Sequence, residues 1–292
     1  MIVITAPTGN IGSQVLAHVL NGAEHIRLIA RDPSKLPSGI RERVEVIEGS
    51  HSQSDVVMKA FDGADSVFWL VTGDPSATSA EAAYVDFARP AVDALRQRGV
   101  KQVVSISALG RGWPTDAGHV TATLRMDDMI ASTGISYRAL TCPSLMENIL
   151  RQRAPIRDQG VFFWPTPGDF KMPACATRDV AAVAARLLLD PSWSGVDEIP
   201  ILGPEDLSFN DMAGIMSEVL GKPVRFQETA MDDMRAMMTG RGASEGMVQA
   251  VVNMLTAKHE GMDHKVARTP STSSPTSFRQ WCEEVLKLAM RG

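Results

Sequence analysis

The chain has 292 residues, enough for one large globular unit or two closely joined ones. Hydrophobic residues make up 44% of it and charged residues 22%, an ordinary globular composition that supports a sizeable buried core. The formal net charge is −5, and no stripe of Lys and Arg is present, which argues against binding to nucleic acid because phosphate backbones require a concentrated basic face.

The cysteines and the N-terminal residues indicate the cellular compartment. Cys142, Cys175 and Cys282 lie far apart, with neither a CxxC pair nor a metal-like spacing to histidine, so we expect free thiols, no disulfide and no metal site. The chain opens directly with a strand pattern instead of a signal peptide, and no apolar stretch is long enough to span a membrane. These features predict a cytoplasmic protein with no membrane partner.

Up to about residue 150, short apolar runs alternate with amphipathic stretches. The runs predict strands over 2–5, 26–30, 44–47, 66–71, 102–107 and 136–140. Helices are predicted over 11–20, 54–61, 79–97 and 120–132. This alternation is typical of βαβ units around a buried parallel sheet, so we predict a Rossmann-type, doubly wound α/β domain over residues 1–150.

Beyond residue 150 the pattern changes, and residues 151–292 are predicted to form a smaller, mainly helical α/β lobe that is interleaved with the first domain. The Pro- and Gly-rich stretch 160–173 predicts an irregular loop or a hairpin. Two helix–strand pairs are expected, a helix over 179–189 with a strand over 198–202 and a helix over 209–220 with a strand over 224–228. A methionine-rich helical segment over 231–262 and a linker over 269–276 precede a last helix over 277–290.

The turn after the first predicted strand has the features of a dinucleotide-binding site. It follows a strand and opens a helix, the context in which such turns hold a pyrophosphate at the positive helix N-terminus. Gly9 allows backbone amides to approach the pyrophosphate, and Gly12 allows the helix to pack closely on the sheet. The predicted cofactor contacts in this turn are Thr5, Pro7, Thr8, Gly9, Asn10, Ile11 and Gly12. The alternative is an ordinary turn between a strand and a helix.

The end of the second predicted strand indicates which cofactor is bound. NAD-selective proteins present Asp or Glu there, whereas this chain has Arg31, whose guanidinium suits a 2′-phosphate. Lys35 adds a second cation, and Asp32 is able to pair with Arg31 or to contact a ribose. The pattern therefore predicts NADP(H), the alternative being that Arg31 and Lys35 are solvated surface charges.

The chain resembles the NmrA-like proteins, an atypical branch of the short-chain dehydrogenases/reductases. The resemblance covers nearly the whole chain and rests on the order and spacing of segments 8–12, 28–35, 67–73, 105–108, 142–148, 177–181, 201–205 and 274–278. It implies an NADP(H) site along the strand ends and a substrate cleft between the Rossmann part and the smaller lobe. It places further cofactor contacts at Ser50, Val71, Thr72, Gly73, Ser105, Ser107, Pro143 and Asn148, and substrate contacts at Trp113 and Met146.

Two positions depart from the family's pattern. Ala6 and Pro7 replace a Gly-Ala pair, which stiffens the turn without destroying it. After the third strand the family has a Gly-Asp pair whose Asp contacts the adenine. This chain has Gly-Ser-His-Ser-Gln at 49–53 instead, so the adenine contact would fall to Ser50 or His51.

The Tyr-x-x-x-Lys pair of ordinary short-chain dehydrogenases is absent, because Ala88 follows Tyr84 and Thr141 follows Tyr137 at the lysine spacing. In those enzymes the lysine lowers the pKa of the tyrosine, so that it passes a proton near neutral pH.

Alignment with the family places His119 at the tyrosine position and Thr123 at the lysine position. His119 is the predicted catalytic residue, as a proton donor, and the alternative is a capping or surface histidine. Arg125 and Asp127 project differently from a helix and are not interpreted as an acid/base pair, and we expect Asp127 at the surface or in the family's scaffold.

Aromatic side chains and methionines give two interpretations of the substrate side. Trp69, Trp113 and residues 162–164 fall in segments that the family places near the cleft, where they either stack on a planar substrate or pack in the core. Core packing is favoured for Trp69, and it is favoured over a ligand pocket for the methionines of 231–262.

Two functions follow. The first is an NADPH-dependent reductase of a quinone-like or aromatic carbonyl small molecule, since quinone reduction can proceed with protons from water. The second is a non-catalytic NADP(H)-binding sensor that regulates a partner protein, which the missing lysine favours. A nucleotide-sugar epimerase is disfavoured because no Tyr–Lys pair exists.

Overall fold

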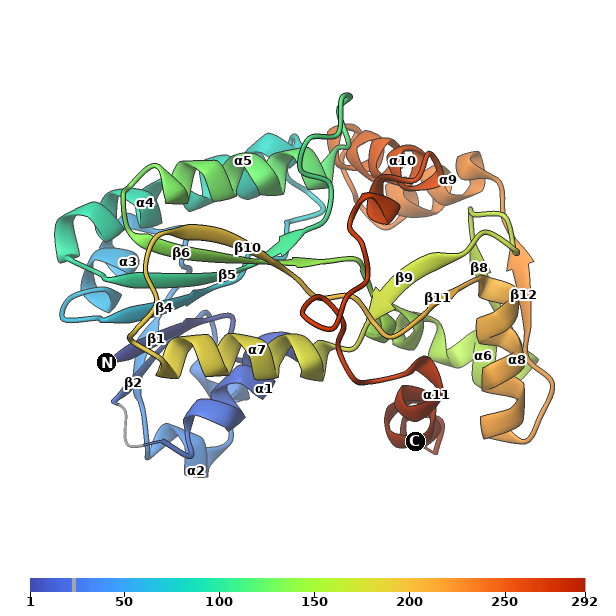
Figure 1. The fold of residues 1–292 in the computed structure, drawn as a ribbon, viewed down its shortest axis with the longest axis horizontal. Helices are drawn as coiled ribbons and strands as arrows, with labels where there is room; N and C mark the ends of the chain where they lie inside the picture. Colours follow the sequence, from blue (N-terminus) through green and yellow to red (C-terminus); the bar gives the residue numbers. More distant parts are fainter. Residues whose placement is uncertain (23–24, 292) are drawn as a thin grey trace.

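A computed structural model describes residues 1–22 and 25–291 (Figure 1). Its central sheet has seven parallel strands in the order β10-β6-β5-β4-β1-β2-β3. The strands are β1 (Ile2–Thr5), β2 (Ile26–Ala30), β3 (Glu45–Glu48), β4 (Ser66–Trp69), β5 (Gln102–Ala108), β6 (Ser136–Cys142) and β10 (Val196–Pro200). The order reverses between β1 and β4, the point at whose carboxyl ends open α/β sheets bind ligands. The predicted Rossmann-type fold is confirmed.

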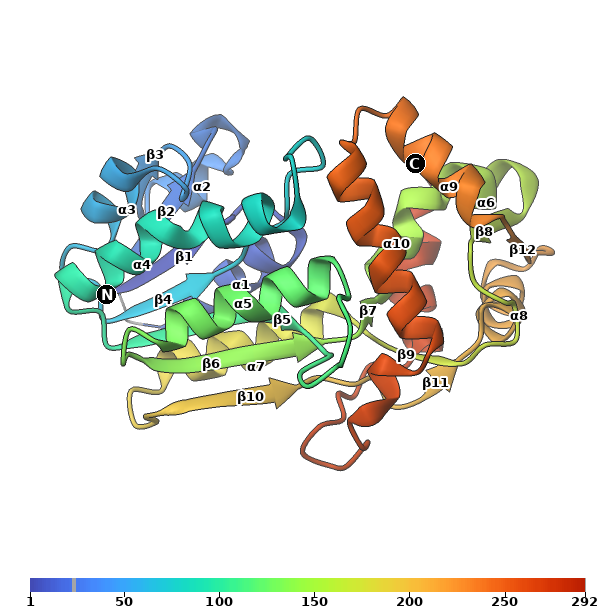
Figure 2. The same ribbon diagram turned by 90° about the horizontal axis from the view of Figure 1, so that it is seen from above.

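Helices cover both faces of this sheet (Figures 1 and 2). On one face lie α1 (Asn10–Val19) and α7 (Thr177–Leu189), and on the other α3 (Ser54–Ala60), α4 (Phe87–Arg98) and α5 (His119–Ala131). Neighbouring strand residues point to opposite faces, so Ile4 of β1 packs with the first group and Val3 with the second. Burial on both faces explains why the strands are continuous apolar runs.

The smaller lobe is built from short strands and helices. Strands β7 (Ser144–Leu145), β9 (Met172–Cys175) and β11 (Asp206–Leu207) form one small sheet, and β8 (Val161–Trp164) pairs with β12 (Arg225–Glu228). The helices of this lobe are α6 (Arg153–Gln159), α8 (Phe209–Leu220), α9 (Met231–Gly240), α10 (Glu245–His259), α11 (Phe278–Trp281) and α12 (Lys287–Ala289). The short α2 (Ser38–Arg41) lies between β2 and β3. The chain enters this lobe after β6, returns to the central layers for α7 and β10, and then enters it again.

The prediction for residues 160–173, an irregular loop or hairpin, is wrong. The stretch contains β8 and the beginning of β9, and each pairs with a strand elsewhere: β8 runs parallel to β12, and β9 lies between β7 and β11. The reason is tertiary, because Phe162 of β8 is fully buried between Phe209 of α8 and Phe226 of β12. The predicted helical segment 231–262 is divided at Gly242, whose φ of 87° ends the first helix.

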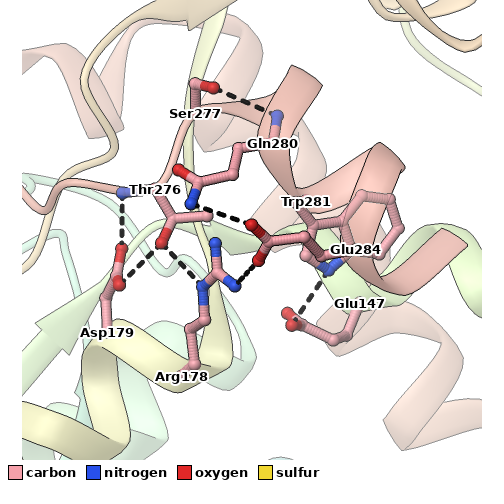
Figure 3. Close-up of polar contacts among 8 residues, drawn as sticks. All are labelled: Glu147, Arg178, Asp179, Thr276, Ser277, Gln280, Trp281 and Glu284. Carbon is pink, nitrogen blue, oxygen red and sulfur yellow. Dashed lines mark hydrogen bonds and ion pairs between the residues drawn. The ribbon is translucent and has the colours of Figure 1, made fainter. Parts of the chain in front are cut away.

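The last helix is fastened to the Rossmann part by a polar cluster (Figure 3). Asp179 of α7 accepts hydrogen bonds from the backbone nitrogen and the hydroxyl of Thr276, at 3.0 and 2.8 Å. Arg178 donates to the same hydroxyl and pairs with Glu284. The 177–181 and 274–278 segments of the family resemblance therefore meet in space, and together they fix the smaller lobe against the start of α7.

Within the described residues, no helix has the length and apolar character needed to cross a membrane. The three cysteines are buried free thiols.

Candidate cofactor and active site

The carboxyl ends of the central strands point toward the smaller lobe (Figures 1 and 2), and the turn between β1 and α1 lies at this edge. A side chain at Gly12 would collide with the carbonyl oxygen of Ala6, and one at Gly9 would come within 3.3 Å of it. Ala6 has a φ of +49° and is the one non-glycine residue with positive φ among those described. The backbone is thus folded tightly against the N-terminus of α1, which fits a pyrophosphate-binding turn.

The side chains of this turn have different environments. Pro7 and Ile11 are buried, and Thr8 is exposed. The Thr5 hydroxyl donates to the carbonyl oxygen of Phe68 at 3.0 Å and accepts from the backbone nitrogen of Leu70 at 2.9 Å. Thr5 therefore joins β1 to the end of β4 across the point where the strand order reverses.

Asn10 opens α1 and is linked to α7. Its side-chain oxygen accepts hydrogen bonds from Gln14 at 3.1 Å and from the Thr177 hydroxyl at 3.4 Å. These bonds hold the N-termini of α1 and α7 side by side, which leaves the backbone amides of the turn as its anion-binding groups.

Arg31 follows β2, is exposed, and forms no ion pair with any residue of the described chain. Asp32 accepts hydrogen bonds from the hydroxyl and backbone nitrogen of Ser34, which lower its pKa, and its carboxylate lies 3.8 Å from Lys35. Asp32 therefore interacts with Ser34 and Lys35 and does not pair with Arg31, so the guanidinium of Arg31 is available to bind a phosphate.

His51 and Ser50, the two substitutes for the missing Asp, differ in their surroundings. The His51 ring lies 3.0 Å from the carbonyl oxygen of Leu70 and makes edge contacts with Trp69 and Phe87. Burial lowers its pKa to about 4, so it is a neutral brace between the ends of β3 and β4. Ser50 is half-buried and bonded to the hydroxyl of Ser52 at 2.8 Å. Trp69 is 1% exposed, as expected of a core residue.

Beyond β4, Val71 is buried and Thr72 is exposed. Gly73 has a φ of +66°, and a Cβ placed there would lie 2.8 Å from the hydroxyl oxygen of Tyr84. The Tyr84 ring also makes an edge contact with His119, with ring centroids 5.8 Å apart.

His119 is the first residue of α5, and its Nδ1 atom is buried without a hydrogen-bond partner. Burial lowers its pKa, so the ring is neutral at neutral pH. At the lysine position, the Thr123 hydroxyl donates to the backbone oxygen of His119 at 2.8 Å.

Asp127 was expected at the surface or in the scaffold, and a surface position is wrong: the residue is 1% exposed between α5 and β5. It accepts hydrogen bonds from the hydroxyls of Ser107 and Tyr137, the latter at 2.5 Å. Burial raises its pKa to about 7 even though both hydrogen bonds act in the opposite direction. The spacing of residues on the helix could have predicted this burial, because Asp127 lies on the same face of α5 as the buried residues Val120, Thr123 and Ile130.

The expected substrate residues lie in packed surroundings. Trp113, in the loop after β5, packs against a buried cluster that contains Val120 and Met262, and Lys265 lies 4.6 Å from its ring centroid. Met146 is 4% exposed in the core of the smaller lobe. Of the remaining predicted cofactor contacts, Ser105 and Pro143 are buried, and Asn148 is half-buried.

Helix α10 passes directly across this edge of the sheet (Figure 2). A side chain at Gly118 would collide with the backbone of Ala250, and one at Gly246 with the backbone of Thr78. The backbone nitrogen of Ser244 also donates to the carbonyl oxygen of Pro75 at 3.0 Å. The smaller lobe therefore covers the loops after β4 and β5, which flank the site.

Residues 7–191 match the model of a family described as NAD(P)H-binding. The chain belongs to this NAD(P)H-binding family. The resemblance to NmrA-like, atypical short-chain dehydrogenases/reductases and the expectation of a nicotinamide cofactor are confirmed.

Similar proteins include an NAD(P)H azoreductase of Xenophilus azovorans, 26% identical over 252 residues, which cover 86% of this chain and 85% of the relative. Quinone oxidoreductase 2 of Escherichia coli is 22% identical over 255 residues, or 87% of this chain and 86% of the relative. The structure of Citrobacter sp. triphenylmethane reductase with NADP(H) aligns with a TM-score of 0.77 at 21% identity, covering 96% of this chain and 98% of that chain.

Proposed function

We propose that this member of the NAD(P)H-binding family is an NADPH-dependent reductase of a quinone-like or aromatic carbonyl small molecule. One observation supports the proposal most strongly. The turn around Gly9 and Gly12, the unpaired Arg31 and the contacting rings of His119 and Tyr84 all lie at the same edge of the central sheet. The names of two similar proteins, an azoreductase and a quinone oxidoreductase, support the same class of substrate.

The residues present fit the cofactor. The amides of the turn around Gly9 and Gly12 would hold the pyrophosphate, and Arg31 with Lys35 the 2′-phosphate. Further contacts are proposed along the strand ends at Thr5, Pro7, Thr8, Asn10, Ile11, Ser50, Val71, Thr72, Gly73, Ser105, Ser107, Pro143 and Asn148. When bound, the cofactor supplies a hydride. Trp113 and Met146 remain the proposed substrate contacts, which requires the loop after β5 or the 146–152 turn to move from its packed position.

His119 is proposed to act where the acceptor takes up its proton. Its place at the N-terminus of α5 and its unpartnered Nδ1 support this role. The imidazole is neutral there and acts through its edge contact with the Tyr84 ring, and not as a cation. Because the lysine position holds Thr123, no ammonium group stands at that position to activate a tyrosine.

The decisive experiment is single-turnover absorbance of protein-bound NADPH against a panel of quinones and aromatic carbonyl compounds. We expect oxidation that depends on the acceptor. If NADPH demonstrably binds and persists with every acceptor, the reductase proposal fails.

The missing Tyr-x-x-x-Lys pair favours a second candidate, a non-catalytic NADP(H) sensor that regulates a partner protein. A sensor should instead change the protease sensitivity of its smaller lobe between NADP⁺ and NADPH. The three free thiols suit a reducing compartment, so we propose a cytoplasmic location for either function.

A further inference from the structure

Tyr84 belongs to a structural irregularity at the candidate site. It lies in a π-helical turn over Ala82–Asp86, directly before α4. Such turns insert one extra residue into a helix and are common at functional sites. This turn packs along α5, and the Tyr84 side chain packs against the core beneath it while its hydroxyl reaches Gly73 in the loop after β4.

The phenol ring lies against the backbone of Gly73. A Cβ at Gly73 would come within 2.8 Å of the hydroxyl oxygen of Tyr84 and within 3.1 Å of two ring carbons. Two features therefore favour glycine at position 73: its φ of +66° and the close approach of the Tyr84 phenol. Since Gly73 is itself a proposed cofactor contact, the hydroxyl lies beside the proposed cofactor position.

The ring is fixed while its hydroxyl is free. Ala80, Ala122 of α5 and Ala250 of α10 pack around the ring, and His119 meets its edge. No residue of the described chain forms a hydrogen bond to the hydroxyl. The hydroxyl oxygen is not fully buried, so solvent or a bound molecule can reach it.

The other tyrosine, Tyr137, has the opposite arrangement: it is 1% exposed, and its hydroxyl is bonded to Asp127. Of the two phenols in the chain, only that of Tyr84 can reach a bound molecule.

We infer that Tyr84 is a catalytic residue whose hydroxyl contacts the oxygen of the acceptor and gives it a proton. This inference rests on the proposed reductase function. Sequence spacing alone set Tyr84 aside because no lysine follows it, but the structure brings it to the site from a different helix.

With a carbonyl-type acceptor, a bound NADPH would supply the hydride and leave as NADP⁺, so that the acceptor oxygen would become an anion. The O–H bond of Tyr84 then breaks as the O–H bond of the product forms, and the phenolate regains a proton from water. Burial raises the pKa of Tyr84, so the phenol keeps its proton at neutral pH and gives it up only to a strong base such as the alkoxide formed from a carbonyl acceptor. His119 acts as a positioning residue that supports the ring.

The test uses the full chain labelled with [¹³Cζ]tyrosine, because two tyrosines give two resonances. Adding NADP⁺ alone should shift one resonance, and Tyr84→Phe should abolish that resonance. The Tyr137 resonance should stay in place. In steady-state kinetics with NADPH and an aromatic ketone or aldehyde, whose alkoxide product must take up a proton, Tyr84→Phe should lower kcat by about 100-fold. The Kd of NADPH should change by less than about twofold, since the ring is retained.

The matched control is Tyr137→Phe, which removes the other phenol hydroxyl, and it should reduce stability while leaving kcat within about twofold of wild type. Normal turnover of Tyr84→Phe, or an NADP⁺ titration that moves neither resonance, would overturn the inference while leaving the reductase function in place. A wild-type protein that binds NADPH and reduces no acceptor would instead overturn the proposed function, and the role of Tyr84 with it.

Discussion

The hydroxyl of Ser107, near the end of β5, donates a hydrogen bond to the carboxyl group of Asp127 on α5, and the hydroxyl of Tyr137 approaches the same group from β6. The three polar side chains are buried between a helix and the sheet, directly below the edge where the cofactor is proposed to lie. A buried carboxyl with two hydroxyl donors and no cation in contact is expensive to ionise, and this cost makes it a source of pH dependence.

We therefore predict that Asp127 makes the protein less stable as the pH rises from about 4 to about 7. Its pKa is 3.8 in an unfolded chain and about 7 in the folded chain. Below about pH 4 both states hold the proton. Between the two pKa values the unfolded chain releases it first, so the free energy of unfolding falls, by on the order of 4 kcal/mol in total.

Asp127→Asn keeps the shape of the side chain and removes its titration, so its stability should vary less with pH than that of wild type. Chemical denaturation between pH 4.5 and 8 measures the slopes. Asp128→Asn is the matched control, because the neighbouring Asp128 is exposed and paired with Arg111, and it should keep the wild-type slope. Equal slopes for wild type and Asp127→Asn would show that Asp127 is ionised in the folded chain.

Arg31 should decide the choice of cofactor. We predict that NADP(H) binds more tightly than NAD(H) by roughly 1.5–3 kcal/mol, because the unpaired guanidinium is able to form charge-assisted hydrogen bonds with a 2′-phosphate. Calorimetric titration of Arg31→Ser should show this preference lost, with NAD(H) affinity nearly unchanged. Arg41→Ser, an exposed arginine on α2 in the same connection, should keep the preference. Equal affinities for both cofactors in the wild type would remove Arg31 from the site.

The left-handed backbone of Ala6 should cost stability that glycine would restore. An L-residue in this region costs roughly 1–2 kcal/mol, and glycine pays no such cost but is more flexible when unfolded. We expect Ala6→Gly to raise the free energy of unfolding by about 1 kcal/mol, measured by urea denaturation. Ala17→Gly, at an exposed position within α1, should lower it by about 0.5–1 kcal/mol. Destabilisation by Ala6→Gly would mean that the turn depends on the stiffness of alanine.

Local signals explain which elements were predictable. The bounds of β1 and α8 agree with the sequence prediction, because β1 is a short buried run and α8 has its own start and stop: a capping box between Ser208 and Asp211, and Gly221 with a φ of 67° at its end.

The features that sequence reasoning missed depend on contacts between distant segments. The burial of Asp127 requires β5 and β6 to lie under α5. The place of Tyr84 beside Gly73 involves a π-helical turn directly before a helix that contains Pro90, which cannot donate to the carbonyl of Asp86, whereas the sequence prediction was one regular helix over 79–97. Trp113 likewise packs against a buried cluster whose Ala257 and Met262 come from a distant part of the chain.

Substitutions at His119 separate two possible sources of the proton, the imidazole of His119 and the phenol of Tyr84. Because burial keeps its ring neutral near pH 7, a direct role as acid would require a protonated form that is scarce under working conditions. We expect His119→Ala to lower kcat for reduction of an aromatic carbonyl compound by about tenfold, through loss of the edge contact that supports Tyr84, and not by the 100-fold or more typical of a lost general acid. His119→Phe retains an aromatic edge without a titratable nitrogen and should restore most of the activity. Steady-state kinetics of both variants between pH 6 and 8, with NADPH affinity measured separately, makes the comparison. If His119→Phe is as impaired as His119→Ala, the imidazole nitrogen itself delivers the proton and Tyr84 does not.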